Sequence, residues 1–186
     1  VLYGEKIARI RDKELKFLIQ TNGLLLNADA AIFIKKHKID LGISLDGPKE
    51  IHDCNRIFAD GAGSYNRIVK NINLLKKLDV KFGVLSVISN WKHINRIFSF
   101  FADNKFDTIK FNFLFPQGRC VLQEQEISEE AAANEFMKIL DKMIKLYKTQ
   151  GLKIKESNLG FILENLISPH SKNRYMCLNS PCGAMF

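Results

Sequence analysis

The sequence lacks any apolar run long enough to span a membrane, and its first residues do not have the pattern of a secretory signal. Neither a membrane protein nor an exported one is therefore expected, and we predict a cytoplasmic location. The chain also does not begin with methionine. Its 186 residues are 46% hydrophobic and 26% charged, a composition that excludes a disordered chain and is typical of one substantial core.

A stripe of basic residues interleaved with aromatic ones is also missing, although the formal net charge is +8. Lysines are spread over most of the predicted helices, as in the pair Lys76 and Lys77. This distribution is typical of solvated helix faces. A nucleic-acid-binding surface is therefore not expected.

Cysteine is scarce, with four residues: Cys54, Cys120, Cys177 and Cys182. The first two are expected to be small packing or loop thiols. The last two stand in the sequence CLNSPCG, where their separation is compatible with metal ligands, a disulfide or no special role. A disulfide is disfavoured without a secretory signal, and two cysteines alone cannot complete a tetrahedral zinc site.

What is present is a repeated alternation of short apolar runs and helical periods. We expect strands within residues 15–20, 41–46, 80–88, 108–115 and 152–155, with helices between them. Such alternation forces parallel strand pairing with right-handed crossovers, so an α/β fold is predicted. Closed barrel, partial barrel and open doubly wound sheet are not separated by this pattern.

The most informative stretch is residues 41–64. Period-two alternation puts three apolar residues of its strand on one face, and Gly42, Ser44 and Asp46 on the other. The Asp-Gly-Pro sequence then ends the strand. No helical period is expected before Ser64, so the connection is a long loop of the kind that is often functional.

Ser44 stands at the carboxyl end of this strand, where parallel α/β sheets bind their ligands. Arg56 lies in the loop beyond it, and a hydroxyl beside a guanidinium suits a small ligand with hydroxyl and carboxylate groups. Asp46 is predicted to be a turn residue that bonds its own backbone. His52 and Asp53 are predicted to be solvated loop residues.

Three segments carry a resemblance to a known family: SLDGP, IHD and NR within residues 44–56, IQTNGLL at 19–25, and the segment from Cys177 to Ala184. The first resembles the fourth-strand segment of radical S-adenosylmethionine enzymes, in the anaerobic sulfatase-maturase and peptide-maturase branch with a SPASM extension. The second is similar to the end of that family's third strand. The third resembles the opening of the SPASM cluster-binding region.

The resemblance implies a partial (β/α) barrel of radical S-adenosylmethionine type. Residues 1–168 would hold about the third to sixth strands, and residues 169–186 would begin the SPASM-type region. We therefore expect an excised piece of a longer protein.

The resemblance also implies cofactors and the residues that hold them. Ser44 and Arg56 match the family's contacts to S-adenosylmethionine, and Leu114 falls near its adenine contact. Cys177 and Cys182 match ligands of an auxiliary 4Fe-4S cluster. The Cys-x-x-x-Cys-x-x-Cys loop for the radical-generating cluster and the Gly-Gly-Glu segment are absent, so this chain alone is not expected to cleave S-adenosylmethionine.

The implied activity is radical modification of a peptide or protein side chain, as in sulfatase maturases or ribosomal peptide maturases. The implied partners are the peptide or protein substrate and a reductant such as ferredoxin or flavodoxin. Two other classes stay open from the residues alone. One is a non-radical barrel enzyme that uses Asp46 and Lys110, and the other is a non-catalytic iron-sulfur or metal-binding module built on Cys177 and Cys182.

Overall fold

A single parallel sheet organises the computed structural model, which describes residues 1–113 and 129–167. Chain order and spatial order agree, as β1-β2-β3-β4-β5, and every neighbouring pair is parallel. The α/β prediction is therefore confirmed. The strands are β1 (Leu18–Thr21), β2 (Asp40–Ser44), β3 (Gly83–Ile88), β4 (Thr108–Phe113) and β5 (Lys155–Glu156).

One helix precedes the first strand, and the others lie between or after the strands along the chain. They are α1 (Leu2–Ile10), α2 (Ala28–Lys36), α3 (Lys49–Asn55), α4 (Tyr65–Lys77), the 3-10 helix η1 (Trp91–His93), α5 (Ile94–Asp103), α6 (Glu129–Gln150) and α7 (Ser157–Ile167). Within residues 1–113 and 129–167, no helix has the length and apolar character needed to cross a bilayer.

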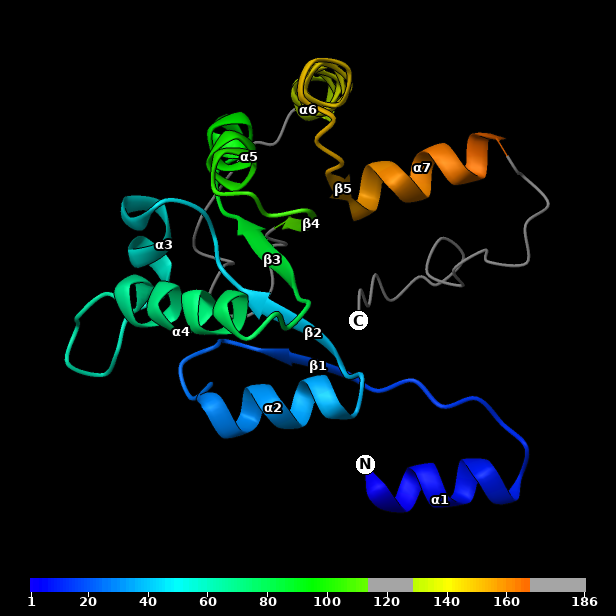
Figure 1. The fold of residues 1–186 in the computed structure, drawn as a ribbon. Coiled ribbons are helices and arrows are strands. Elements are labelled where there is room, and N and C mark those ends of the chain that lie inside the picture. The colour runs from blue at the N-terminus through cyan, green and yellow to red at the C-terminus, as the bar shows by residue number, and fades with distance from the viewer. Residues whose placement is uncertain (114–128, 168–186) are drawn as a thin grey trace.

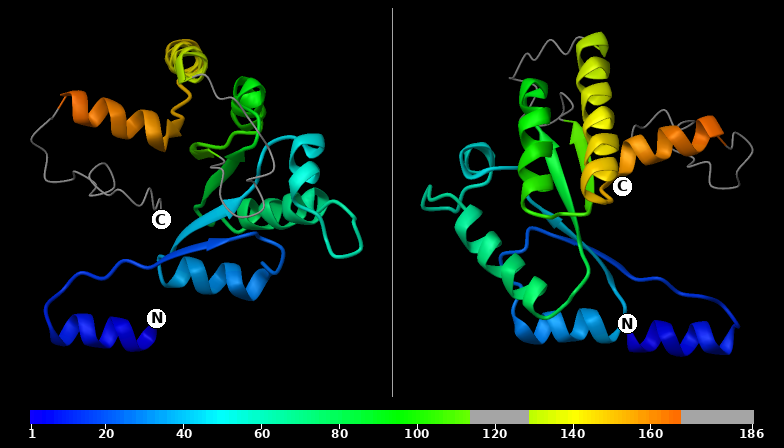
Figure 2. Two further views of the ribbon diagram at one scale, coloured as in Figure 1. Left: turned by 180° about the vertical axis from the view of Figure 1, so that it is seen from behind. Right: turned by 45° about the horizontal axis from the view of Figure 1, so that its top comes forward.

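The unbroken strand order distinguishes a partial barrel from a doubly wound sheet. A doubly wound sheet reverses its order at a switch point and is covered on both faces. Winding in one direction with right-handed crossovers instead puts every crossover helix on the same face. Figure 1 shows α2, α4, α5 and α6 along one side of the sheet, and Figure 2 shows α5 and α6 lying side by side. The winding is that of a partial (β/α) barrel.

The core lies between the sheet and these helices. Alternate strand residues point into it, and Phe111 of β4 meets Phe136 of α6 edge to face, with ring centroids 6.4 Å apart. An aromatic residue of β4 thus packs against a flanking helix. The largest fully buried side chains include Ile43, Leu45, Ile68, Ile72, Leu75, Ile88, Ile97, Phe98, Phe101 and Ile109.

The opposite face of the sheet carries small and polar residues. Gly42 leaves room there, because a Cβ at this position would lie 2.6 Å from Cδ1 of Leu85 and would displace that side chain. Gln20, Gly42, Leu85 and Lys110 line a cleft on this face. The predicted alternation in β2, with Gly42 and Ser44 away from the helices, therefore matches the structure.

The prediction of no helix before Ser64 is wrong, because α3 begins directly after Pro48. Its seven residues make two turns, too few for a repeating apolar period to be visible in the sequence. Ile51 and His52 are its buried residues. The helix is positioned by tertiary packing rather than by its own propensity.

Glu156 ends β5 and joins it to α7. The residue is 0% exposed, and its carboxylate accepts hydrogen bonds from the backbone amides of Phe111 at 3.2 Å and Leu159 at 2.7 Å. The side chain thus continues the β4–β5 ladder and caps α7 at once. Burial raises the pKa of Glu156, and these backbone donors act in the opposite direction.

Replacing Glu156 by glutamine tests this double role. The Glu156→Gln amide group turns a donor toward one of the backbone N–H groups, so we expect the free energy of unfolding to fall by about 1–3 kcal/mol. Urea denaturation at pH 7 measures it. The control is Glu164→Gln on the exposed face of α7, with an expected change within about 0.5 kcal/mol. Equal losses in the two variants would contradict the assignment.

Candidate functional site

The carboxyl end of β2 opens the candidate site. Beyond Ser44 the chain turns at Gly47, whose φ of 128° is unfavourable for other residues and whose Cβ would lie 3.0 Å from Ile97. Figure 1 shows α3 on the side toward which the arrowheads of β2 and β3 point, and the loop beyond α3 extending away from the sheet. This is the sheet edge where parallel α/β folds hold their ligands.

The carboxylate of Asp46 is buried at the centre of this region, with the residue 1% exposed. Its Oδ2 accepts a hydrogen bond from Arg56 Nε at 2.6 Å, and its Oδ1 accepts one from Arg56 Nη2 at 3.1 Å. Oδ1 also accepts the backbone amide of Val87 in β3 at 2.9 Å. The prediction that Asp46 bonds its own backbone is wrong, because the side chain serves the neighbouring strand and Arg56 instead.

The guanidinium of Arg56 is held along one edge, which leaves its other edge for a ligand. An arginine has five N–H donors, and the hydrogens of Nε and Nη2 that point the same way form the fork bound by Asp46. Within the described residues nothing accepts a hydrogen bond from Nη1, so a second fork, made by Nη1 and Nη2, has no partner there. The side chain is 27% exposed, so a second carboxylate can reach it.

His52 is fully buried and links three parts of the loop. Its Nδ1 accepts the backbone amide of Asp46 at 3.1 Å, and its Nε2 lies 3.0 Å from Oγ of Ser64. The Ser64 hydroxyl donates to the carbonyl of Arg56 at 2.8 Å, so His52 Nε2 is the donor to Ser64. The prediction that His52 is a solvated loop residue is therefore wrong.

This hydrogen-bond pattern requires the neutral imidazole. Burial lowers the pKa of His52 from its usual 6.5, and the charge of Arg56 adds to this while that of Asp46 opposes it. The unfolded chain therefore takes up this proton at a higher pH than the folded one. The contribution of His52 to stability is present above pH 6.5 and is lost as the pH falls toward the folded pKa.

Asp53 is a structural residue rather than a solvated one. Its Oδ1 accepts the backbone amide of Tyr65 at 2.9 Å and so caps α4. Ser64 precedes α4 as predicted, but its hydroxyl is used by Arg56. Gly63 is required here, because a Cβ would lie 2.1 Å from the Asp53 carboxyl carbon.

Two further side-chain contacts join α3 to the rest of the fold. Asn55 at its end donates to Oγ of Ser89, directly after β3, at 3.2 Å. Glu50 in its first turn accepts from Arg96 of α5. The first contact lies beside the carboxyl end of β3, and the second is an exposed ion pair on the surface.

The predicted site residues fall into two groups. Ser44 is buried at the tip of β2, and in the described part of the chain no hydrogen bond involves its Oγ. Leu114, Cys177 and Cys182 lie outside the described residues. Residues 1–113 and 129–167 contain no group of three or more His, Cys, Asp or Glu side chains arranged to hold a metal ion.

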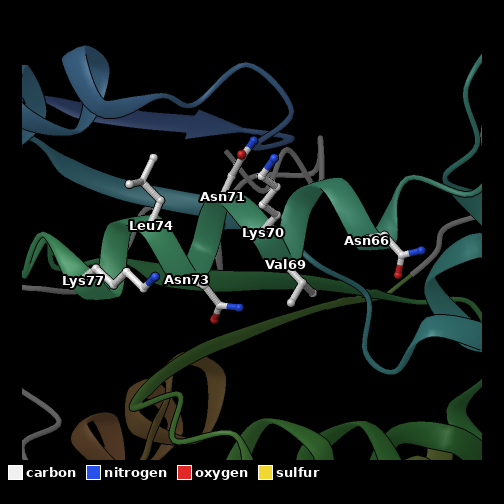
Figure 3. Close-up of a pocket in the computed structure, with 7 residues that line it drawn as sticks. All are labelled: Asn66, Val69, Lys70, Asn71, Asn73, Leu74 and Lys77. Carbon is white, nitrogen blue, oxygen red and sulfur yellow. The ribbon is translucent and has the colours of Figure 1, made fainter.

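A hollow on α4 does not contribute to this site. It is lined by residues of that helix alone, and the buried stripe Ile68, Ile72 and Leu75 is not among them. Figure 3 shows the lining side chains, with Asn71 on the side of α4 toward β1. Its amide donates to the carbonyl of Gly23 at 2.8 Å, which makes it a structural residue.

Sequence comparison finds relatives that match part of the chain, although no family model matches it. The chain is 40% identical over 103 residues to a cysteine-type anaerobic sulfatase-maturating enzyme of Clostridium novyi (strain NT), a match covering 54% of this chain and 28% of the relative. It is 35% identical over 81 residues to a serine-type anaerobic sulfatase-maturating enzyme of Bacteroides thetaiotaomicron, covering 44% of this chain and 20% of the relative.

The fold has a solved counterpart. "Native anSMEcpe with bound AdoMet and Cp18Cys peptide" superposes with a TM-score of 0.78 at 22% identity, covering 92% of this chain and 49% of the other. The chain is thus similar in sequence to part of two anaerobic sulfatase-maturating enzymes and has the fold of this solved structure. This sulfatase-maturase-like chain spans less than a third of each of the two relatives and about half of the solved structure.

Replacing Asp46 by asparagine tests the buried pair at the centre of the site. The Asp46→Asn side chain points an N–H donor at one of its present donors, so we expect the free energy of unfolding to fall by about 1.5–3 kcal/mol. Urea denaturation at pH 7 measures it. The control, Glu50→Gln, breaks the exposed pair with Arg96 and is expected to cost less than about 1 kcal/mol. An Asp46→Asn protein as stable as the wild type would contradict the structural role.

Proposed function

We propose that the sulfatase-maturase-like chain binds S-adenosylmethionine at the carboxyl end of β2, and that the protein modifies a peptide or protein side chain by radical chemistry. The observation that carries this proposal is the geometry of Arg56. Asp46 fixes one fork of the guanidinium, and the other fork is directed to whatever carboxylate occupies the strand ends. S-adenosylmethionine supplies an α-carboxylate of the required kind.

The other proposed contacts suit the rest of that ligand. The Ser44 hydroxyl stands at the strand tip and can donate to or accept from a polar group of the ligand. Leu114, directly after β4, is proposed to contact the adenine through its apolar side chain. The residues described at this edge fit S-adenosylmethionine, because the partly exposed Arg56 carries the charge opposite to its carboxylate.

The proposed chemistry divides between the ligand and the chain. When bound beside a reduced 4Fe-4S cluster, S-adenosylmethionine supplies a radical that removes a hydrogen atom from the substrate. This chain's residues bind and orient the ligand and keep its carboxylate in place. Cys177 and Cys182 are proposed ligands of an auxiliary 4Fe-4S cluster. A ferredoxin or flavodoxin is the proposed reductant, in the reducing setting of the cytoplasm.

The substrate is proposed to be a peptide segment of a sulfatase or of a ribosomally made precursor. Support comes from the relatives, which are named for sulfatase maturation, and from the solved counterpart, which holds a peptide. Both cysteine-type and serine-type enzymes are among the relatives. The residue type that is modified is therefore not part of the proposal.

A non-radical barrel enzyme is a weaker explanation of the same residues. It needs Asp46 as a general base, yet three N–H donors already bond this carboxylate. A buried carboxylate that is held by three N–H donors is not free to approach a substrate proton. Lys110 lies on the cleft face beside Leu85 rather than near Asp46.

Arg56→Gln tests the proposed ligand contact. The probes are S-adenosylmethionine and its decarboxylated analogue, whose dissociation constants are measured by equilibrium dialysis on the anaerobically prepared protein in its full natural length. A charge-assisted contact predicts that the wild type prefers S-adenosylmethionine by about tenfold or more. Arg56→Gln is expected to reduce this preference to near one.

Arg96→Gln is the matched control, because Arg96 pairs with the carboxylate of Glu50 on the surface. It is expected to keep the wild-type preference. The proposal is wrong if the wild type does not bind S-adenosylmethionine, or if Arg56→Gln retains the wild-type preference.

A further inference from the structure

We propose that His52 is a positioning residue that, together with Ser64, fixes the backbone of Arg56 and so aims its guanidinium at the ligand. The functional part of this inference rests on the proposed binding of S-adenosylmethionine. The geometric part concerns the order of Arg56 and can be tested without any ligand.

The backbone of Arg56 is held on both sides by these two residues. Its amide donates to the carbonyl of His52 at 3.0 Å, in the last turn of α3. Its carbonyl accepts the Ser64 amide at 3.1 Å and the Ser64 hydroxyl at 2.8 Å. Because the imidazole of His52 donates to that same hydroxyl, it orients the Ser64 lone pairs and hydrogen toward Arg56.

The same imidazole also holds the backbone of the residue that grips the guanidinium. His52 Nδ1 accepts the amide of Asp46, whose carboxylate binds Arg56. One side chain therefore ties the strand tip, the end of α3 and the start of α4 into a closed ring of hydrogen bonds. The ring of Tyr65 closes the edge of this cluster, with its centroid 5.9 Å from that of His52.

Burial of His52 and Ser64 means that water cannot take over their hydrogen bonds to the Arg56 loop. His52 is 0% exposed and Ser64 is 4% exposed, so water cannot replace a hydrogen bond that either residue loses. A change at His52 thus leaves an unpaired group beside Arg56, and the loop must move to satisfy it. Such a movement would turn the Nη1 and Nη2 donors of Arg56 away from the position of the ligand carboxylate.

Two substitutions separate the two hydrogen bonds of the imidazole. Asparagine has an oxygen near the Nδ1 position, so His52→Asn can keep the bond from Asp46 but loses the one to Ser64. Glutamine has an amide nitrogen near the Nε2 position, so His52→Gln can keep the bond to Ser64 but loses the other. Both bonds are lost in His52→Ala, and Ser64→Ala removes the hydroxyl that binds Arg56.

The first measurement follows hydrogen exchange of the Arg56 Nε–H by nitrogen-15 NMR, without ligand. We expect exchange at least about fivefold faster in His52→Ala and Ser64→Ala, with smaller increases in His52→Asn and His52→Gln. The control is Asn71→Ala, which removes a bonded amide two turns further along α4. An unchanged Arg56 signal in His52→Ala, or an equal increase in Asn71→Ala, overturns the inference.

The second measurement compares binding of S-adenosylmethionine with that of its decarboxylated analogue. A positioning role predicts that His52→Ala lowers the preference for the carboxylate about fivefold, whereas Asn71→Ala leaves it unchanged. General destabilisation weakens both ligands equally and does not alter their ratio. If Arg56→Gln abolishes the preference while His52→Ala keeps it, the inference fails and the proposed function stands. If Arg56→Gln also keeps it, the proposed function fails.

Discussion

The site depends on one charge-assisted pair, the carboxylate of Asp46 and the guanidinium of Arg56. The carboxylate is buried, and it has three donors because Val87 of the neighbouring strand adds its amide. A buried carboxylate would be costly without such partners. The pair thus joins two strands and the loop beyond them, and it leaves one fork of the guanidinium for a ligand in the proposed function.

The same structural device appears twice in the sheet. Asp46 follows β2 and accepts an amide of β3, and Glu156 ends β5 and accepts an amide of β4. In both places the backbone leaves the ladder and a carboxylate replaces the missing carbonyl. Each carboxylate then has a second task, the orientation of Arg56 in one case and the capping of α7 in the other. The backbone amides beside these strand ends therefore have hydrogen-bond partners within the protein and do not need water.

Much of the fold could be predicted from the sequence, because its strands and longer helices carry clear periods. The helix cap at Asn27, which accepts the amide of Ala30, is a local signal of the same kind. The short helix α3 has too few residues to show a period. The position of Asp46 on the buried polar face of β2 was a signal that its carboxylate has a special role. Its partner in the neighbouring strand could not be predicted, because Val87 is 41 residues away in the sequence. For His52 no signal in the sequence distinguishes a buried linker from a solvated loop residue, because its partners are set by tertiary packing.

The central claim is that Asp46 fixes Arg56 so that its second fork receives the ligand carboxylate. A crystal structure of the protein with S-adenosylmethionine tests it most directly. The account predicts the ligand carboxylate about 2.7–2.9 Å from Nη1 and Nη2 of Arg56, while Asp46 still holds Nε. A carboxylate bound elsewhere, or an Arg56 that leaves Asp46 to bind it, would contradict the account.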